Sequence, residues 1–160
     1  MTNHRQAGGW GRLICGLFFC LSFLASREAR AEEPLKFKAQ LIWGTDTEKP
    51  VDSKEKIKDL DPKCKEMLGR LFKWKNYYQV DQDTVITVPH KGSKITCMSH
   101  DCVVEIFHQN DRNIEVHLYG EGKLYQKINK DLSKGKYLFV GGNIKKKDNE
   151  AWIVAISLVE

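Results

Sequence analysis

The sequence lacks three features that would each point to a class of protein. It has no apolar run long enough to span a membrane, because its longest apolar block, Leu13 to Leu24, falls short of the about 20 residues that a transmembrane helix needs. It has no internal repeat or low-complexity tract, which argues against a solenoid and against a disordered chain. It also has no recognisable catalytic motif, so we do not expect an enzyme.

A strong excess of one charge is also lacking once the first 31 residues are set aside. The whole chain carries a formal net charge of +5, but those residues hold four arginines and one glutamate. The remainder, with 22 basic and 20 acidic residues, has a net charge of only +2. Such a balance gives no compositional support for nucleic-acid binding, and we predict no nucleic-acid partner.

The first 31 residues have the order of a secretory signal peptide. Arg5 and Arg12 supply a positive start, the apolar block follows, and Ala29-Arg30-Ala31 matches the small-x-small pattern before a cleavage site. We therefore predict a signal peptide over 1–31 and a single domain over 32–160, located in the periplasm or secreted. The well-formed cleavage site disfavours a retained anchor, so contact with the membrane is expected only during export.

The rest of the chain predicts a mainly β domain. Alternation from Leu35 to Trp43 indicates a half-buried strand, and Thr47 to Lys58 is polar and indicates an exposed loop. Asp61-Pro62 begins a helix whose predicted apolar stripe comprises Leu60, Cys64, Met67, Leu68, Leu71 and Phe72. Further strands are predicted at 77–81, 84–89, 94–98, 102–108, 113–119, 123–128, 137–140 and 151–158. This spacing favours an antiparallel sandwich or barrel with one helix packed against it.

Cys97 and Cys102 lie in the best-defined hairpin of the sequence. If Met98 to Asp101 forms the loop, the two cysteines are directly opposite each other, at a Cβ separation of about 4.5–5.5 Å that a disulfide can relax into. We therefore predict a Cys97–Cys102 disulfide, which suits an oxidising compartment. Cys64 would then be a spare thiol, either buried on the helix stripe or bonded to another chain.

A metal site is the alternative interpretation of the same hairpin. Cys97, His100 and Cys102, with His90 or His108 as a fourth ligand, offer sulfur and nitrogen donors of the kind that hold zinc or copper. The spacing departs from the usual Cys-x₂-Cys knuckle, and thiolates in an exported protein tend to be oxidised. The disulfide is therefore the preferred prediction, and no cofactor is expected.

A possible binding surface lies just after the predicted helix. Lys73, Trp74, Lys75 and Tyr77 interleave cations with aromatic rings, a pattern that can stack on sugars or pair with acidic groups. The simpler interpretation is a helix-to-strand junction whose rings fill the core while the lysines stay in water.

Three short segments resemble a set of small exported bacterial proteins of uncharacterised function. They are Leu41-Ile42-Trp43-Gly44-Thr45-Asp46, Phe72-Lys73-Trp74-Lys75-Asn76-Tyr77 and Gly120-Glu121-Gly122-Lys123-Leu124. The resemblance implies a signal peptide and a compact, mainly β domain. It implies no activity and no site residues.

The leading functional hypothesis is a non-catalytic exported domain that binds a protein or a cell-envelope component. One alternative is the metal-binding hairpin. The other is an inhibitor of a secreted hydrolase, acting through a projecting loop at Asn143 to Asn149 or Thr47 to Lys58; it rests on analogy of fold alone.

Overall fold

The computed structural model describes residues 33–48, 56–142 and 150–159. They form one helix and nine strands, which confirms the predicted mainly β fold class. The elements are β1 (Leu35–Thr45), β2 (Ile57–Asp59), α1 (Pro62–Leu71), β3 (Asn76–Val88), β4 (Ser93–Ser99), β5 (Cys102–Asn110), β6 (Asn113–Gly120), β7 (Lys123–Asp131), β8 (Tyr137–Gly142) and β9 (Glu150–Leu158).

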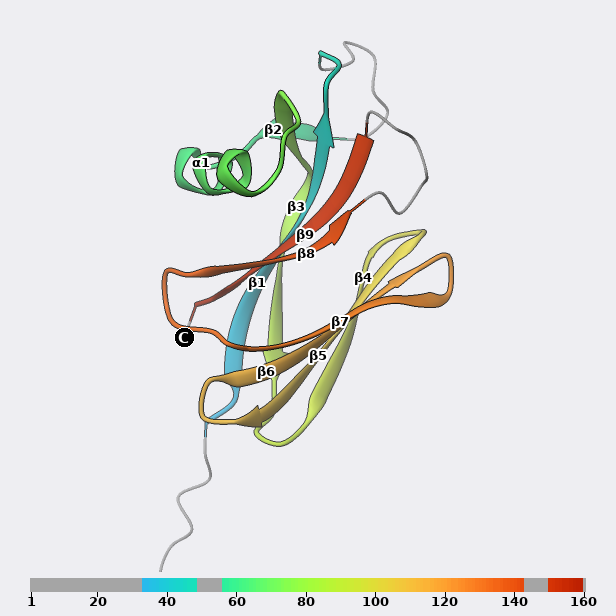
Figure 1. Ribbon diagram of the computed structural model, residues 1–160. Coiled ribbons are helices and arrows are strands. Elements are labelled where there is room, and N and C mark those ends of the chain that lie inside the picture. Colours follow the sequence, from blue (N-terminus) through green and yellow to red (C-terminus); the bar gives the residue numbers. More distant parts are fainter. Residues whose placement is uncertain (1–32, 49–55, 143–149, 160) are drawn as a thin grey trace, which may run out of the picture. The chain divides into compact units, whose positions relative to one another are not determined.

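The strands form two antiparallel sheets rather than a closed barrel. One sheet has the order β2-β3-β1-β9-β8, and the other has the order β4-β5-β6-β7. Figure 1 shows the first sheet with α1 beside it and the second sheet formed by successive hairpins. Of the two architectures that the sequence favoured, the structure is sandwich-like.

The two sheets enclose the main core. Side chains that alternate along β1, β5 and β6 face one another across this core, as expected when each strand places every second residue inward. The fully buried members include Phe37, Ala39, Val104, Ile106, Ile114, Val116, Leu118, Val140 and Ile156. We call this the inter-sheet core.

A second, smaller cluster lies on the other face of the first sheet. It joins Ile42 of β1 and Ile153 of β9 to Cys64 and Leu68 of α1, all of them fully buried. The predicted half-buried strand is therefore half-buried only in its first part, because α1 covers the second part of β1. The apolar run of β9 is covered on both faces, as predicted.

The helix begins as the sequence predicts. The Asp61 carboxylate accepts hydrogen bonds from the backbone N–H groups of Lys63 at 3.0 Å and Cys64 at 3.1 Å, and Pro62 occupies the first helical position. The predicted apolar stripe is correct for Leu60, Cys64 and Leu68, which are buried in the same cluster. It is wrong for Leu71, whose side chain is 63% exposed because this last helical residue lies beyond the contact with the sheet.

Two local predictions in the first sheet are corrected. The two strands predicted at 77–81 and 84–89 are one long strand, β3, and the end of the predicted loop at Thr47 to Lys58 pairs with β3 as β2. A bulge separates the halves of β3: Ala39 pairs with Thr84 but Leu41 pairs with Val80. Polar residues at a bulge look like a turn in the sequence, which is why one strand was predicted as two.

Candidate functional site

The structure separates the four residues of the predicted binding surface. Lys73 and Lys75 are exposed, Trp74 is half-buried, and Tyr77 is only 4% exposed. Tyr77 belongs to the cluster beneath α1, and its burial there raises the pKa of its hydroxyl. It therefore does not contribute to a binding surface, which corrects that part of the prediction.

Trp74 is held in place by the end of β1. A side chain at Gly44 would meet the Trp74 ring at 3.3 Å, so the indole lies directly over this glycine. The Trp74 ring also lies 5.6 Å from the ring of Phe72, and the Lys75 N–H donates to Asp46 Oδ1 at 3.1 Å. The simpler interpretation of the segment is therefore correct for its rings, which pack on the protein while the lysines stay exposed.

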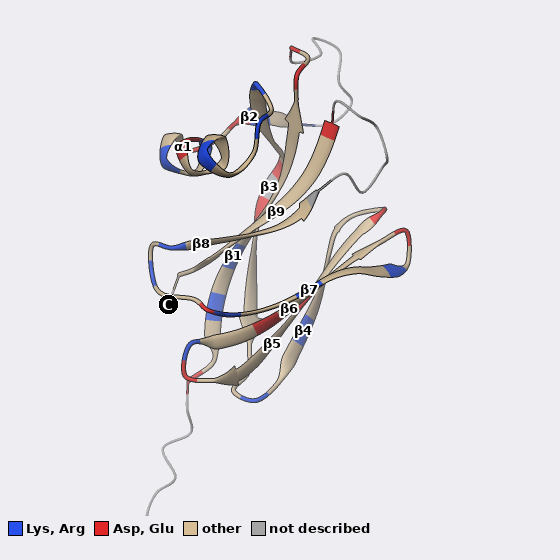
Figure 2. Cartoon of the chain, viewed as in Figure 1, with Lys and Arg blue, Asp and Glu red and all other residues tan. Residues whose placement is uncertain are grey.

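An apolar and basic surface remains at the end of α1. Arg70, Leu71, Phe72, Lys73 and Trp74 line an open cavity of about 390 Å³, and we call these residues the α1-terminal patch. Basic residues of α1 and the segment after it are visible in Figure 2. Sequence reasoning missed Arg70 and Leu71, because the helical period assigned Leu71 to the buried stripe. The only signal for Leu71 was its place at the end of a short helix.

The cysteine hairpin has a different register from the predicted one. Its loop contains only His100 and Asp101, so Ser99 pairs with Cys102 and Cys97 pairs with Val103. A bulge between Cys97 and Ser99 allows Met98 to reach the core, where it is 8% exposed. Because one residue of slip reverses the face of every side chain, Ile95 does not share the buried face of Val104 and Ile106, and it is 60% exposed.

The predicted Cys97–Cys102 disulfide is absent for the same reason. Both thiols are free: Cys97 is exposed and its Sγ contacts the Ser99 carbonyl oxygen, whereas Cys102 is buried. Burial raises the pKa of Cys102 to about 11 and that of Cys64, under α1, to about 12. Thiols with such pKa values are weak nucleophiles at neutral pH.

The alternative metal site receives no support from the geometry. His100 is 98% exposed at the hairpin tip, where its Nδ1 lies 2.7 Å from Asp101 Oδ1 and not beside the two sulfurs. The rings of His90 and His108 contact each other edge to face, with their centroids 4.9 Å apart. They lie before β4 and near the end of β5, away from the loop of the hairpin that joins the two strands. Within residues 33–48, 56–142 and 150–159, no three His, Cys, Asp or Glu side chains are grouped so that they could hold a metal ion.

A chain of polar contacts covers the outer face of the second sheet. Lys127 Nζ lies 2.8 Å and His117 Nε2 lies 2.7 Å from Glu115 Oε1, and the Tyr119 hydroxyl donates to Glu105 Oε2 at 3.1 Å. We call these five residues the outer-face network. They meet because β6 lies between β5 and β7 with Glu105 opposite His117 and His117 opposite Lys127.

The charged and polar side chains of the outer-face network shift one another's pKa values. The hydrogen bond from Lys127, followed by the one from His117, lowers the pKa of Glu115, so this carboxylate stays ionised. Loss of solvation and the hydrogen bond to Glu105 raise the pKa of Tyr119, so this hydroxyl stays protonated. Since the acids and donors satisfy one another, the network has the character of a structural element rather than of a reactive site.

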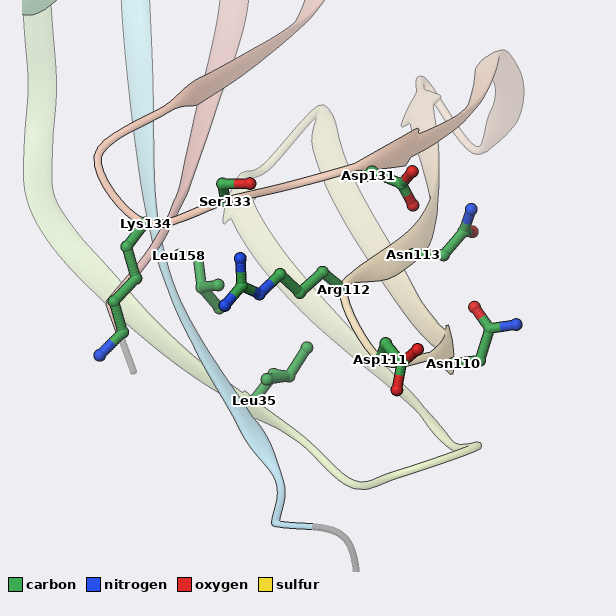
Figure 3. Close-up of a pocket in the computed structure, with 9 residues that line it drawn as sticks. All are labelled: Leu35, Asn110, Asp111, Arg112, Asn113, Asp131, Ser133, Lys134 and Leu158. Carbon is green, nitrogen blue, oxygen red and sulfur yellow. The ribbon is translucent and has the colours of Figure 1, made fainter.

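A cavity lies at one end of the sandwich and is shown in Figure 3. It has a volume of about 790 Å³, and we call it the end cavity. It is formed by the turn between β5 and β6, the segment after β7, the start of β1 and the end of β9. Its lining residues are Leu35, Asn110, Asp111, Arg112, Asn113, Asp131, Ser133, Lys134 and Leu158. Sequence reasoning did not identify it, because four distant segments contribute.

Comparison with known proteins adds no further information on the fold or the site. Family models, curated proteins and solved structures give no significant match to this chain. In the part of the chain that the structure describes, no helix is long and apolar enough to cross a membrane. The predicted loop at Asn143 to Asn149 lies outside the described residues.

Proposed function

We propose that this chain is a non-catalytic binding domain, exported to the periplasm or secreted, that recognises a protein or a cell-envelope component through the α1-terminal patch. The observation that carries the proposal is Leu71. This leucine is 63% exposed at the edge of the cavity that it lines with Phe72 and Trp74. An exposed leucine beside two half-buried rings is a small apolar site of the kind that partners cover.

The charges around this site indicate the chemistry of the partner. Lys73 and Lys75 are exposed, whereas Arg70 is already paired with Glu66 on the helix surface. A partner that presents an apolar side chain next to carboxylates would bury Leu71 and place its acids beside the two lysines. Burying one leucine contributes about 1.5–3 kcal/mol, and the exposed cations chiefly raise the association rate.

A non-catalytic role is supported by the state of the acid and base groups. The carboxylates, histidine and tyrosine of the outer-face network are hydrogen-bonded to one another. The buried thiols have raised pKa values, which disfavours nucleophilic chemistry at Cys64 and Cys102.

The proposal is tested by the double variant Leu71→Glu with Lys73→Glu. It removes the exposed apolar side chain of Leu71 and reverses one charge. It leaves the packing of the Trp74 ring against Gly44 unchanged, so we expect the fold to persist. The protein is exported by its own signal peptide, and its measured mass is expected to correspond to a chain that begins at Glu32. This protein is used to capture partners from isolated cell envelopes and from the secreted fraction. Loss of a bound component with the variant is the expected result.

The matched control is Val85→Glu with Lys136→Glu, which makes the same change at two exposed residues outside the patch. We expect this control to bind as the unmodified protein does. If both double variants lost binding equally, or if neither lost binding, the α1-terminal patch would not be the binding site. Failure of the unmodified protein to bind either fraction would contradict the binding role itself.

A further inference from the structure

The end cavity differs from the outer-face network in that its charged side-chain groups are not paired with one another. Arg112, Lys134, Asp111 and Asp131 all line the cavity, and none of their charged groups makes a hydrogen bond or ion pair with another residue of the described chain. A folded protein that brings opposite charges to one cavity without pairing them leaves those charges available to a ligand.

The charges are also sorted in space. Figure 3 shows the Arg112 side chain running from the β5–β6 turn towards Leu158 and Ser133, with Lys134 beyond them. Asp111 and Asp131 lie on the other side, together with Asn110 and Asn113. One end of the cavity is therefore cationic, and the other end is acidic.

An apolar floor lies at the cationic end. It is formed by Leu35, at the start of β1, and Leu158, at the end of β9, which lie at the edge of the inter-sheet core. The acidic end has no such apolar lining, because the residues that line it are Asn110, Asp111, Asn113 and Asp131.

These three features define the ligand by its chemistry. A simple anion would be attracted by Arg112 but opposed by Asp131, and a simple cation would meet the reverse pattern. A molecule with both charges and an apolar part satisfies all of the groups. The volume of about 790 Å³ lies within the range of about 300–1,000 Å³ that small-molecule sites occupy.

We propose that the end cavity binds a zwitterionic ligand of the class of apolar amino acids and short peptides. The ligand carboxylate contacts Arg112, whose planar guanidinium suits two parallel hydrogen bonds, with Lys134 nearby. The ligand ammonium contacts Asp131 and Asp111. The apolar side chain lies on Leu35 and Leu158. This site shares no residue with the α1-terminal patch and does not depend on the proposed function.

The test uses three forms of one probe: leucyl-leucine, its N-acetylated form and its C-terminal amide. Binding is followed by titration calorimetry and by amide shifts of the isotopically labelled protein. We expect the zwitterion to bind at least about tenfold more tightly than either blocked form, since each blocked form loses a charge-assisted contact. Shifts are expected at Arg112, Asp131 and Leu158.

Two variants assign the two ends of the ligand. Arg112→Gln is expected to abolish the preference for the free carboxylate over the amide while keeping the preference for the free amine. Asp131→Asn is expected to do the opposite. Lys94→Gln, which removes an exposed cation of β4 outside both the end cavity and the α1-terminal patch, is expected to bind all three probes as the unmodified protein does.

The proposal is overturned by three results. They are absence of binding at millimolar leucyl-leucine, equal binding of the zwitterion and both blocked forms, and unchanged preferences in Arg112→Gln. Each variant is first compared with the unmodified protein by circular dichroism and urea unfolding. This comparison distinguishes a variant that has unfolded from one that is folded but has lost ligand binding.

Discussion

Gly141 and Gly69 differ in the space that each leaves for a side chain. Gly141, in β8, has a φ of 137°, and a Cβ placed on it would lie 2.3 Å from the Trp152 carbonyl oxygen and 3.0 Å from Ile153 Cα. These are backbone atoms of β9 and cannot move without disrupting the strand pair. Gly69 lies inside α1, and nothing comes within 4 Å of the position that its Cβ would occupy.

We predict that alanine has opposite effects at these two residues. Gly141→Ala is expected to lower the free energy of unfolding by about 2–3 kcal/mol or more, because both the space and the φ are unsuitable. Gly69→Ala is expected to raise it by about 0.5–1 kcal/mol, because alanine favours the helix. Urea unfolding of both variants measures these changes. A neutral Gly141→Ala would contradict the close contact between β8 and β9.

At the scale of elements, the β4–β5 hairpin shows how a loop length decides the environment of each side chain. The two-residue loop and the bulge at Met98 place Cys97 in solvent and Cys102 in the core. A four-residue loop, as the sequence predicted, would have placed both cysteines on one face. The two registers therefore predict different reactivities for the thiols of Cys97 and Cys102.

Among Cys64, Cys97 and Cys102, we predict that only Cys97 reacts rapidly with iodoacetamide in the folded protein. Cys64 and Cys102 are buried and have raised pKa values, so few of their thiols are accessible and ionised at pH 8. Mass spectrometry of peptides from the labelled protein shows which of these three cysteines are modified, and labelling in urea supplies the control in which all three are modified. A Cys97–Cys102 bridge, detected as protection of both thiols even in urea, would contradict this hairpin register.

At the scale of the whole domain, β1 and β9 join the two cores. β1 places Leu41 in the inter-sheet core and Ile42 under α1, and β9 places Ile156 and Ile153 in the same way. Because each strand contributes to both cores, neither core is expected to unfold while the other stays intact.

We therefore predict that Ile156→Ala and Leu68→Ala destabilise the same transition. Each removes a fully buried side chain, and each is expected to lower the free energy of unfolding by about 2–5 kcal/mol. Urea unfolding is followed by far-ultraviolet circular dichroism and by tryptophan fluorescence, and the two signals should change together in both variants. Separate transitions in Leu68→Ala would instead show that α1 unfolds independently.

The candidate site shows which of its residues were predictable. The exposed positions of Lys73 and Lys75 and the packing of Trp74 follow from local polarity and were anticipated as one of two interpretations. The burial of Tyr77 agrees with the simpler interpretation, in which the rings fill the core, and not with its place in the predicted binding surface. Leu71 was assigned to the wrong environment, because the helical period does not show where a neighbouring sheet ends. The end cavity was not predictable, because strand order brings its four segments together.

Features that depend only on neighbouring residues could be read from the amino-acid sequence alone. The Asp61-Pro62 start of α1, the alternation along β1 and the succession of hairpins follow from hydrogen bonds and side-chain periods within short segments. By contrast, the hairpin register, the exposure of Leu71 and the proximity of Arg112 to Leu158 became known only from the folded structure. These depend on which distant surfaces pack together, and packing is decided by the whole set of buried side chains rather than by any one segment.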